Sequence, residues 1–319
     1  MMRFDCFVWA RSLKPSRDTS SCMQIRKANI VESMKGSSDN VARLGICELG
    51  LHAFETDMPA EILEIISKED DSNNSHDVIP SLAQLLRHSR NLEVAYLCTP
   101  EAIQVSRIPK EGGHFCGYRN IQMLWSGLPK EAKEKLALSK PSIPDIQAMI
   151  EKAWDAGINA HGRVQTGGVK GTRKHIGTSE AEAILLNNSI PCTGKTFSGS
   201  AAWSQLLDYV EAYFASSHLS TEDEIKQISL PPIFLQRPHH SITIVGFERT
   251  KSGKRRLLTF DPAWRPPKQM TRPQPSKPHS KWDIYWTMER YRKGKRYLKR
   301  YKAFETLVID KIEPNHHVN

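Results

Sequence analysis

The stretch Gly112-Gly113-His114-Phe115-Cys116-Gly117-Tyr118-Arg119-Asn120-Ile121-Gln122 sets one cysteine among small residues and directly before a helix-like run. The N-terminus of a helix carries a partial positive charge and free N–H groups, which favour the nucleophilic thiolate form of a cysteine. Gly113 and Gly117 would let the backbone turn sharply and let a substrate carbonyl approach. Cys116 is therefore either a nucleophile or a buried structural cysteine, and partner residues elsewhere in the chain must decide between the two.

Two strands further along the chain offer a proton acceptor. Residues 232–236 predict a short strand, and the β-branched run at residues 241–246 predicts a core strand. His239 and His240 stand between them. A histidine in this position can take the proton of a cysteine thiol, although a lone histidine would indicate only a satisfied core or surface residue.

A carboxylate follows on the next predicted strand. Residues 248–256 predict a charged turn, and residues 257–262 predict the second strand of a hairpin with Asp261 at its exit. A histidine at the entry of one strand and an aspartate at the end of its neighbour are expected side by side, where the carboxylate can orient the imidazole and stabilise its charged form. A lone Asp-Pro step would predict only a turn. Cysteine, histidine and aspartate in these contexts together predict a catalytic triad.

These segments resemble the ZUFSP-type deubiquitinases, which are papain-like cysteine proteases related to the proteases of the ubiquitin-fold modifier. The Gly-X-X-Cys-Gly-Tyr-Arg-Asn block at residues 113–120, the His-Ser step at 240–241 and the Phe-Asp-Pro step at 260–262 carry the resemblance. It covers about residues 79–313, and more weakly residues from 44 onward. Supporting similarities lie at residues 79–83, 95–98, 153–157, 176–180 and at the end of a predicted basic helix, 304–308.

The resemblance implies an α+β papain-like fold, in which a helical subdomain bearing Cys116 packs on an antiparallel β-sheet that carries His240 and Asp261. It implies a cysteine-type deubiquitinase that hydrolyses isopeptide bonds after the C-terminal glycine of ubiquitin. In the modifier-specific branch the histidine follows the aspartate directly, whereas Ala263 follows Asp261-Pro262 here. The histidine must then come from the preceding strand, which favours ubiquitin as substrate. His239 is a rival for the role, because adjacent strand residues point to opposite faces. The resemblance favours His240, because the family's histidine stands directly before the serine.

Three more residues receive roles from the resemblance. Gln236 matches a family glutamine and is expected to stabilise the oxyanion together with the Cys116 backbone N–H; the alternative is an ordinary polar strand end. Glu180 and Asp155 match acidic positions and are expected to bind arginines in the ubiquitin tail. The alternative for both is an acid at a helix start that complements the helix dipole. Ser179 and Glu182 fit a capping box for a helix over residues 181–186.

Composition frames the predicted domain. The six cysteines of the 319-residue chain form no Cys-x-x-Cys pair, which suits a reducing compartment and argues against disulfides and a zinc finger. We expect no metal or other cofactor, no membrane span, a monomer, and a location in the cytoplasm or nucleus. Residues 1–43 predict a poorly ordered leader, 44–314 a single peptidase domain and 315–319 a tail. Residues 69–77 are acidic and rich in Asn and Ser, which is typical of a linker.

The net charge of +10 is concentrated in the C-terminal part of the chain. Residues 249–302 contain eighteen Lys or Arg and three Asp or Glu. Part of this region, residues 266–282, predicts a Pro-rich mobile loop. Residues 289–302 predict a basic helix, which is either a solvated face or a weak, salt-dependent contact for nucleic acid or an acidic partner.

Two other functions stay open. One is a protease for another ubiquitin-like modifier. The other is a non-catalytic protein that binds ubiquitin or nucleic acid on the same scaffold, against which the intact Cys116, His240 and Asp261 set argues.

Overall fold

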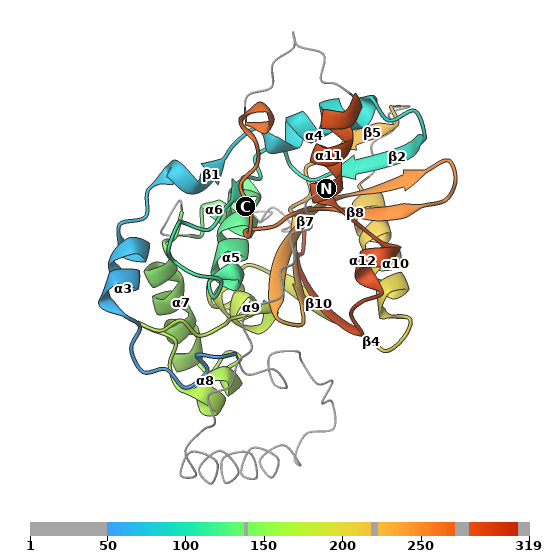
Figure 1. The fold of residues 1–319 in the computed structure, drawn as a ribbon. Coiled ribbons are helices and arrows are strands. Elements are labelled where there is room, and N and C mark those ends of the chain that lie inside the picture. The colour runs from blue at the N-terminus through green and yellow to red at the C-terminus, as the bar shows by residue number, and fades with distance from the viewer. Residues whose placement is uncertain (1–49, 137–139, 218–222, 272–280, 312–319) are drawn as a thin grey trace, which may run out of the picture. The chain divides into compact units, whose positions relative to one another are not determined.

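An eight-stranded sheet forms the centre of the computed structural model, which describes residues 50–136, 140–217, 223–271 and 281–311 (Figure 1). The strand order is β4-β10-β6-β7-β2-β5, and β8 pairs with the other edge of β7 and with β9. All pairings are antiparallel except that of β2 with β5. The strands are β2 (Leu92–Leu97), β4 (Cys192–Ser198), β5 (Ile225–Gln227), β6 (Ile233–Arg237), β7 (His240–Thr250), β8 (Arg255–Phe260), β9 (Arg292–Gly294) and β10 (Ala303–Ile309). A separate pairing joins β1 (Asn74–Ser75) to β3 (Gln104–Val105).

Helices cover both faces of this sheet (Figure 1). One layer contains α5 (Cys116–Ser126), α7 (Ile143–Asp155) and α9 (Thr178–Asn187), with α3 (Ala60–Ser67) packed on α7. The opposite layer contains α4 (Val78–Arg87), α10 (Ala202–Ala215), α11 (Lys281–Tyr291) and α12 (Lys295–Leu298). Short helical turns complete the described part: η2 (Asp71–Asn73), α6 (Lys130–Lys133), α8 (His161–Thr166) and η3 (Lys268–Met270). None of the described helices has the length and apolar character that crossing a membrane requires.

Two hydrophobic cores lie on the two faces of the sheet, because successive side chains of a strand point in opposite directions. In β6, Ile233 and Leu235 belong to the core under α10, whereas Phe234 belongs to the core under α5, α7 and α9. All three side chains are fully buried. The apolar residues of this predicted strand therefore contribute side chains to the cores on both faces of the sheet. The expected α+β fold, with helices packed on an antiparallel sheet, is confirmed.

The turn between β6 and β7 fixes the position of His240. Arg237 pairs with His240, so Pro238 and His239 form a two-residue turn. Proline sets its own φ for the first turn position, and His239 adopts the left-handed region at φ 63° in the second. His240 is consequently the first residue of β7, and the next inward-facing residues, Ser241 and Thr243, lie towards α5.

Strand β7 is longer than the sequence predicts, because part of the predicted charged turn is paired strand. Glu248 is fully buried, and its carboxylate binds both Arg256 (2.6 Å) and Arg292 (2.8 Å). These two cations neutralise a charge that would otherwise be costly to bury. The turn is reduced to the four residues between Thr250 and Arg255.

The predicted basic helix over residues 289–302 is wrong. Helix α11 ends at Tyr291, residues 292–294 form strand β9 on the edge of β8, and α12 begins at Lys295. Residues 304–308, expected at the end of that helix, lie instead in β10, where they pair with β4 and β6. Unpaired backbone groups at the edge of β8 and two buried faces for β10 override the local helical preference here.

Several expectations about the domain limits lie outside the described residues. The leader at 1–43, the tail at 315–319 and the ends of the predicted domain at 44–314 fall there. Within the predicted loop at 266–282, Lys268–Met270 forms η3 and Lys281 begins α11, while residues 272–280 are outside the described part. All of the described residues belong to one compact unit.

Candidate active site

Cys116 is the first residue of α5, as the sequence predicts. The helix packs on β7, the strand that begins with His240. Cys116 is 8% exposed, and the side chains of His240 and Asp261 are 17% and 16% exposed. The nucleophile candidate is therefore mostly withdrawn from water and lies at the positive end of a helix, both of which matter for its ionisation.

The three predicted residues come together in space. The Nε2 atom of His240 lies 2.8 Å from Oδ1 of Asp261, which follows directly after β8. The His240 imidazole also interacts with the Cys116 thiol, which lowers the pKa of the thiol and raises the pKa of the imidazole. His239, the rival, lies at the exposed tip of the turn. Of the two histidines at this turn, His240 is the one whose described contacts include both the sulfur and the carboxylate.

These contacts change the pKa of each of the three groups so that its charged form is favoured. Burial by itself raises the pKa of Cys116, but the interaction with His240 and its charge, together with interactions with the backbone and side chain of Ser241, bring that pKa below its ordinary value. Burial lowers the pKa of His240, yet bonds to Asp261 and Cys116 raise it to about 9. Burial opposes ionisation of Asp261 too, but His240 and the Ala263 N–H lower its pKa. All three shifts favour the charged forms, which are the thiolate, the imidazolium and the carboxylate.

The other described cysteines show how specific this environment is. Burial raises the pKa of Cys98 far above its ordinary value, and burial raises the pKa of Cys192 to about 12. Both remain thiols at neutral pH. Among the described cysteines, Cys116 therefore has the chemistry of a nucleophile, since the thiolate is the reactive form.

Gln236 is linked to Cys116 indirectly, because Ser241 contacts both residues. The Ser241 hydroxyl is 4.0 Å from the Cys116 sulfur and donates a hydrogen bond to Oε1 of Gln236. The Nε2 atom of Gln236 donates to the Arg237 carbonyl at 3.1 Å. An amide nitrogen carries two hydrogens, so one remains for an incoming oxyanion. Sequence reasoning assigns no role to Ser241, although its position directly after His240 is the available signal.

The residues that follow Cys116 attach the first turn of α5 to the rest of the site. The Asn120 amide donates to the Cys116 carbonyl at 2.6 Å and accepts a hydrogen bond from the Thr243 hydroxyl of β7. The Tyr118 hydroxyl donates to the Lys174 carbonyl at 3.2 Å. These bonds link the cysteine helix to the histidine strand and to the segment before α9.

Gly117 has a packing role instead of the predicted turn-forming role. A Cβ atom at this position would lie 2.3 Å from the Ile176 carbonyl oxygen, so any side chain would force α5 and residues 176–177 apart. Gly113 has open space around its Cα, whereas Gly112 takes the left-handed turn at φ 87°. The lack of a side chain thus allows a close contact between helix and loop at Gly117 and a left-handed turn at Gly112.

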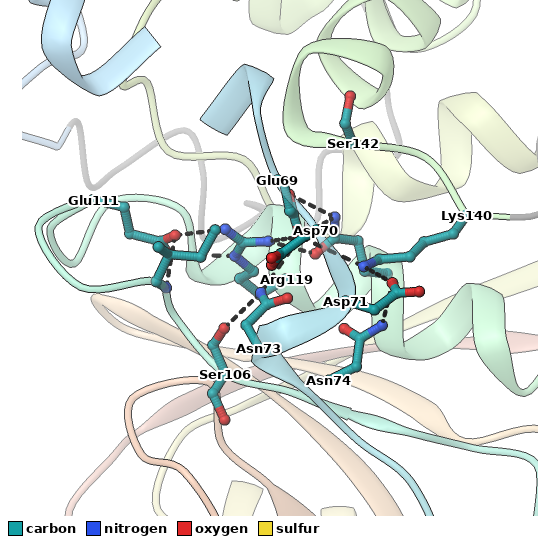
Figure 2. Close-up of polar contacts among 12 residues, drawn as sticks. Glu69, Asp70, Asp71, Asn73, Asn74, Ser106, Glu111, Arg119, Lys140 and Ser142 are labelled. Atoms are coloured by element: carbon teal, nitrogen blue, oxygen red, sulfur yellow. Dashed lines mark hydrogen bonds and ion pairs between the residues drawn. The ribbon is translucent and has the colours of Figure 1, made fainter. Parts of the chain in front are cut away.

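Arg119 anchors the same helix through a buried ion network (Figure 2). Its guanidinium is fully buried between Glu111 and Glu69, whose side chains are 1% and 2% exposed. Arg119 also donates to Gln122 at 2.9 Å, and Nε donates to Glu111 at 3.2 Å. Lys140 lies 3.8 Å from Glu69. Glu111 in turn accepts the Ile108 N–H at 2.9 Å, so the network fixes the loop that leads into Cys116.

This network corrects the interpretation of residues 69–77 as a linker. Glu69 is buried against Arg119, and Asn73 donates to the Ser106 carbonyl at 2.9 Å (Figure 2). Residues 71–75 form η2 and β1. Of the acidic and amide side chains that suggest a solvated linker, Glu69 binds the buried Arg119 and Asn73 binds the Ser106 carbonyl.

Three histidines border the loop before Cys116. His114 has one ring nitrogen 3.3 Å from His52 and the other 3.3 Å from His175. Burial first, and the neighbouring His52 and His175 next, lower the pKa of His114 to about 4. His114 is therefore uncharged at neutral pH and does not compete with His240 as the imidazolium partner of the thiolate. Among the described residues, no group of three or more His, Cys, Asp or Glu side chains is arranged to hold a metal ion.

Glu180 lies at the start of α9, but the helix begins earlier than the sequence predicts. The helix begins at Thr178 and not at residue 181, and Oε2 of Glu180 accepts the Gly177 N–H at 2.8 Å. The predicted capping pair of Ser179 and Glu182 is therefore wrong. Burial raises the pKa of Glu180. The Gly177 backbone lies next to Gln236, so the start of α9 borders the candidate active site.

Asp155 lies at the end of α7 and not at a helix start, which excludes the helix-dipole interpretation for this residue. Its carboxylate binds Arg163 at 2.6 Å, and its side chain is 69% exposed. Arg163 also binds Glu151. The charge of Asp155 is thus already balanced within the protein, and no contact described here joins it to Cys116.

A cysteine at a helix N-terminus, packed on an antiparallel sheet that supplies histidine and aspartate, is the arrangement of a papain-like cysteine peptidase. The sequence profile of peptidase family C78 matches residues 92–307, and this span contains all three residues. The chain belongs to peptidase family C78.

Curated proteins similar to this chain include two whose names describe ubiquitin hydrolysis. The zinc finger-containing ubiquitin peptidase 1 of Bos taurus is 37% identical over 158 residues, 47% of this chain and 27% of that protein. The ubiquitin carboxyl-terminal hydrolase mug105 of Schizosaccharomyces pombe is 32% identical over 158 residues, 47% of this chain and 60% of that protein. The chain thus spans about a quarter of the zinc finger-containing relative. The crystal structure of UfSP from C. elegans matches 72% of this chain and 37% of that chain with a TM-score of 0.44 and 14% identity.

Proposed function

We propose that this protein is a cysteine-type deubiquitinase that hydrolyses the isopeptide bond after the C-terminal glycine of ubiquitin. One observation carries the proposal: His240 joins the Cys116 thiol to the Asp261 carboxylate, with 2.8 Å between Nε2 and Oδ1. The names of the two curated relatives support ubiquitin as the modifier.

In the proposed reaction the Cys116 thiolate attacks the glycine carbonyl carbon. The resulting oxyanion receives hydrogen bonds from the Cys116 backbone N–H and from the Gln236 amide. When the C–N bond breaks, the His240 imidazolium gives its proton to the departing lysine amine, which leaves a thioester on Cys116. His240 then takes a proton from water, the hydroxyl attacks the thioester, and the released thiolate is again paired with an imidazolium. Asp261 holds the imidazole in place throughout.

Recognition of the ubiquitin tail is proposed to involve Glu180 more than Asp155. Glu180 is mostly buried beside Gly177, which lies against Gln236, and its second oxygen can accept from a substrate guanidinium while Oε2 caps α9. Asp155 would first have to release Arg163. A substrate arginine would then replace Arg163 as the partner of Asp155. This exchange gains little free energy, because an exposed ion pair contributes little in water.

The test is covalent labelling with ubiquitin that carries a C-terminal electrophile, followed by a panel of di-ubiquitins. Cys116→Ala is expected to abolish labelling and chain cleavage while Cys192→Ala keeps both. Full labelling of Cys116→Ala would refute the proposed nucleophile. Parallel probes built on other ubiquitin-like modifiers separate a deubiquitinase from a protease for another modifier. A wild-type protein that binds ubiquitin but reacts with no probe would indicate a non-catalytic binding protein.

A further inference from the structure

A groove of about 1500 Å³ lies on the α10 and α12 side of the sheet, and no residue of the candidate active site lines it. Its walls come from α10, the tip of the β7–β8 hairpin, α11 and the segment from β9 to α12. Eight cationic side chains line this groove, against a single carboxylate, that of Glu289. Strand β9 separates α11 from α12, so residues 289–302 do not form one straight helix. Cationic side chains from β9 and α12 line the groove together with side chains from α11.

Most of the positive charge in the groove is not balanced within the described part of the chain. Arg255 is paired with Asp208 and Glu211, and Arg256 and Arg292 share Glu248. The other five lining cations have no carboxylate partner among the described residues: Lys254, Lys295, Arg296, Lys299 and Arg300. Like charges that face one hollow repel one another, and an anionic occupant would relieve that repulsion.

Aromatic rings stand among these cations. The ammonium groups of Lys295 and Lys299 lie 5.1 and 5.3 Å from the centre of the Trp203 ring, and Trp203 lines the groove. Tyr285 also lines it and is 49% exposed. Trp203 is partly buried and packs against the core, so Tyr285 is the more exposed of the two rings. Basic grooves with accessible rings are suited to single-stranded nucleic acid, whose phosphates pair with the cations while its bases stack on the rings.

We propose that this groove binds single-stranded nucleic acid, independently of the peptidase reaction. A duplex hides its base faces and would use only the charges, and an acidic peptide would likewise leave the rings unused. The combination of five unbalanced cations with Trp203 and Tyr285 therefore favours an unpaired strand.

The experiment measures fluorescence anisotropy of a labelled single-stranded oligonucleotide of about 16 nucleotides with the full chain over a range of salt concentrations. Competitors are a duplex of the same length, poly-glutamate and ubiquitin. The test variant is Lys295→Glu/Lys299→Glu. The matched control, Lys68→Glu/Lys130→Glu, makes the same change in net charge at two lysines that are 75% and 84% exposed and lie outside the groove. Tyr285→Ser tests stacking without any change in charge.

The groove double variant is expected to bind at least about tenfold more weakly and to reduce the salt slope by about 1.4, while the control double variant binds like wild type. Tyr285→Ser should lose about tenfold in affinity. All variants should keep the wild-type melting temperature and cleave di-ubiquitin normally, which excludes unfolding as the cause. Equal weakening in both double variants, unchanged affinity in Tyr285→Ser, or equal competition by duplex, poly-glutamate or ubiquitin would each overturn the proposal, as would absence of binding.

Discussion

Nε2 of His240 lies 2.8 Å from Oδ1 of Asp261, and the same imidazole interacts with the Cys116 thiol. The same Asp261 oxygen accepts the Ala263 N–H at 2.9 Å. Two hydrogen bonds to the same oxygen therefore hold the carboxylate in place. In that position it orients the imidazole and stabilises its charged form.

The pH profile of kcat/KM should be bell-shaped. Activity rises with pH as Cys116 becomes a thiolate, at a pKa below the ordinary value for a thiol, and falls as His240 loses its proton at about 9. In Asp261→Asn a cause that raises the His240 pKa is removed, so the alkaline limb should move to lower pH. The rate should fall by about 10²–10⁴-fold. Rates measured from pH 5 to 10 check this; an unchanged alkaline limb would separate Asp261 from the ionisation of His240.

Gln236→Ala should lower kcat by about 10²–10³-fold with a small change in KM, because loss of one oxyanion donor affects the transition state. Ser241→Ala is the matched variant, since it removes the hydroxyl that donates to Gln236 but leaves the amide in place. Steady-state kinetics on a ubiquitin substrate distinguish the two. An equal loss in both variants would mean that Gln236 acts by holding Ser241.

Glu180→Gln should raise KM for a ubiquitin substrate by about tenfold and change kcat less, since charge-assisted bonds to an arginine contribute about 1.5–3 kcal/mol. The amide oxygen can still accept the Gly177 N–H, so the start of α9 is preserved. Asp155→Asn should change KM less, because Arg163 already binds that carboxylate. Initial rates over a range of substrate concentrations test both, and the reverse order of effects would reassign the contact.

Arg119→Met should destabilise the protein by about 3–5 kcal/mol, because Glu69 and Glu111 would remain buried without their cation. Adding Glu69→Gln and Glu111→Gln to the same chain should recover part of this loss. Arg255→Met, which breaks a partly exposed pair, should cost at most about 1 kcal/mol. Urea unfolding followed by fluorescence gives the free energies, and equal costs for the two arginines would contradict a structural role for the buried network.

Gly117→Ala should lower the melting temperature and slow labelling by the ubiquitin probe. The added Cβ would meet the Ile176 carbonyl oxygen at 2.3 Å, so the helix start that carries Cys116 must move. Overpacking of this kind costs about 1–3 kcal/mol. Gly113→Ala is the control for stability, because no atom lies within 4 Å of the position that its Cβ would take. Similar melting temperatures for both variants would show that the close contact is not needed.

Much of the site could be predicted from local sequence. The block around Cys116 predicts a helix that begins at the cysteine, and the strands that carry His240 and Asp261 follow from β-branched runs and turn residues. These patterns act over a few residues, so neighbouring side chains and backbone preferences are enough to specify them.

Other features depended on contacts between residues far apart in the chain. Residues 69–77 look like a linker until Arg119, fifty residues away, needs Glu69 as a buried counter-ion. Residues 289–302 look helical until the edge of β8 offers backbone partners to residues 292–294. Local composition carries no information about such partners, because their effect arises only when the chain has folded and water is excluded.

The sequence by itself determined the class of site: a cysteine at a helix start, with histidine and aspartate at the adjoining ends of two strands. Only the tertiary structure decided which histidine reaches the sulfur, since the turn at Pro238 and His239 directs His240 towards Cys116 and leaves His239 at the exposed tip. It also decided that the Cys116 pKa is lowered and the Cys98 pKa raised. Both thiols are buried, and the difference is the imidazole that long-range packing places beside one of them.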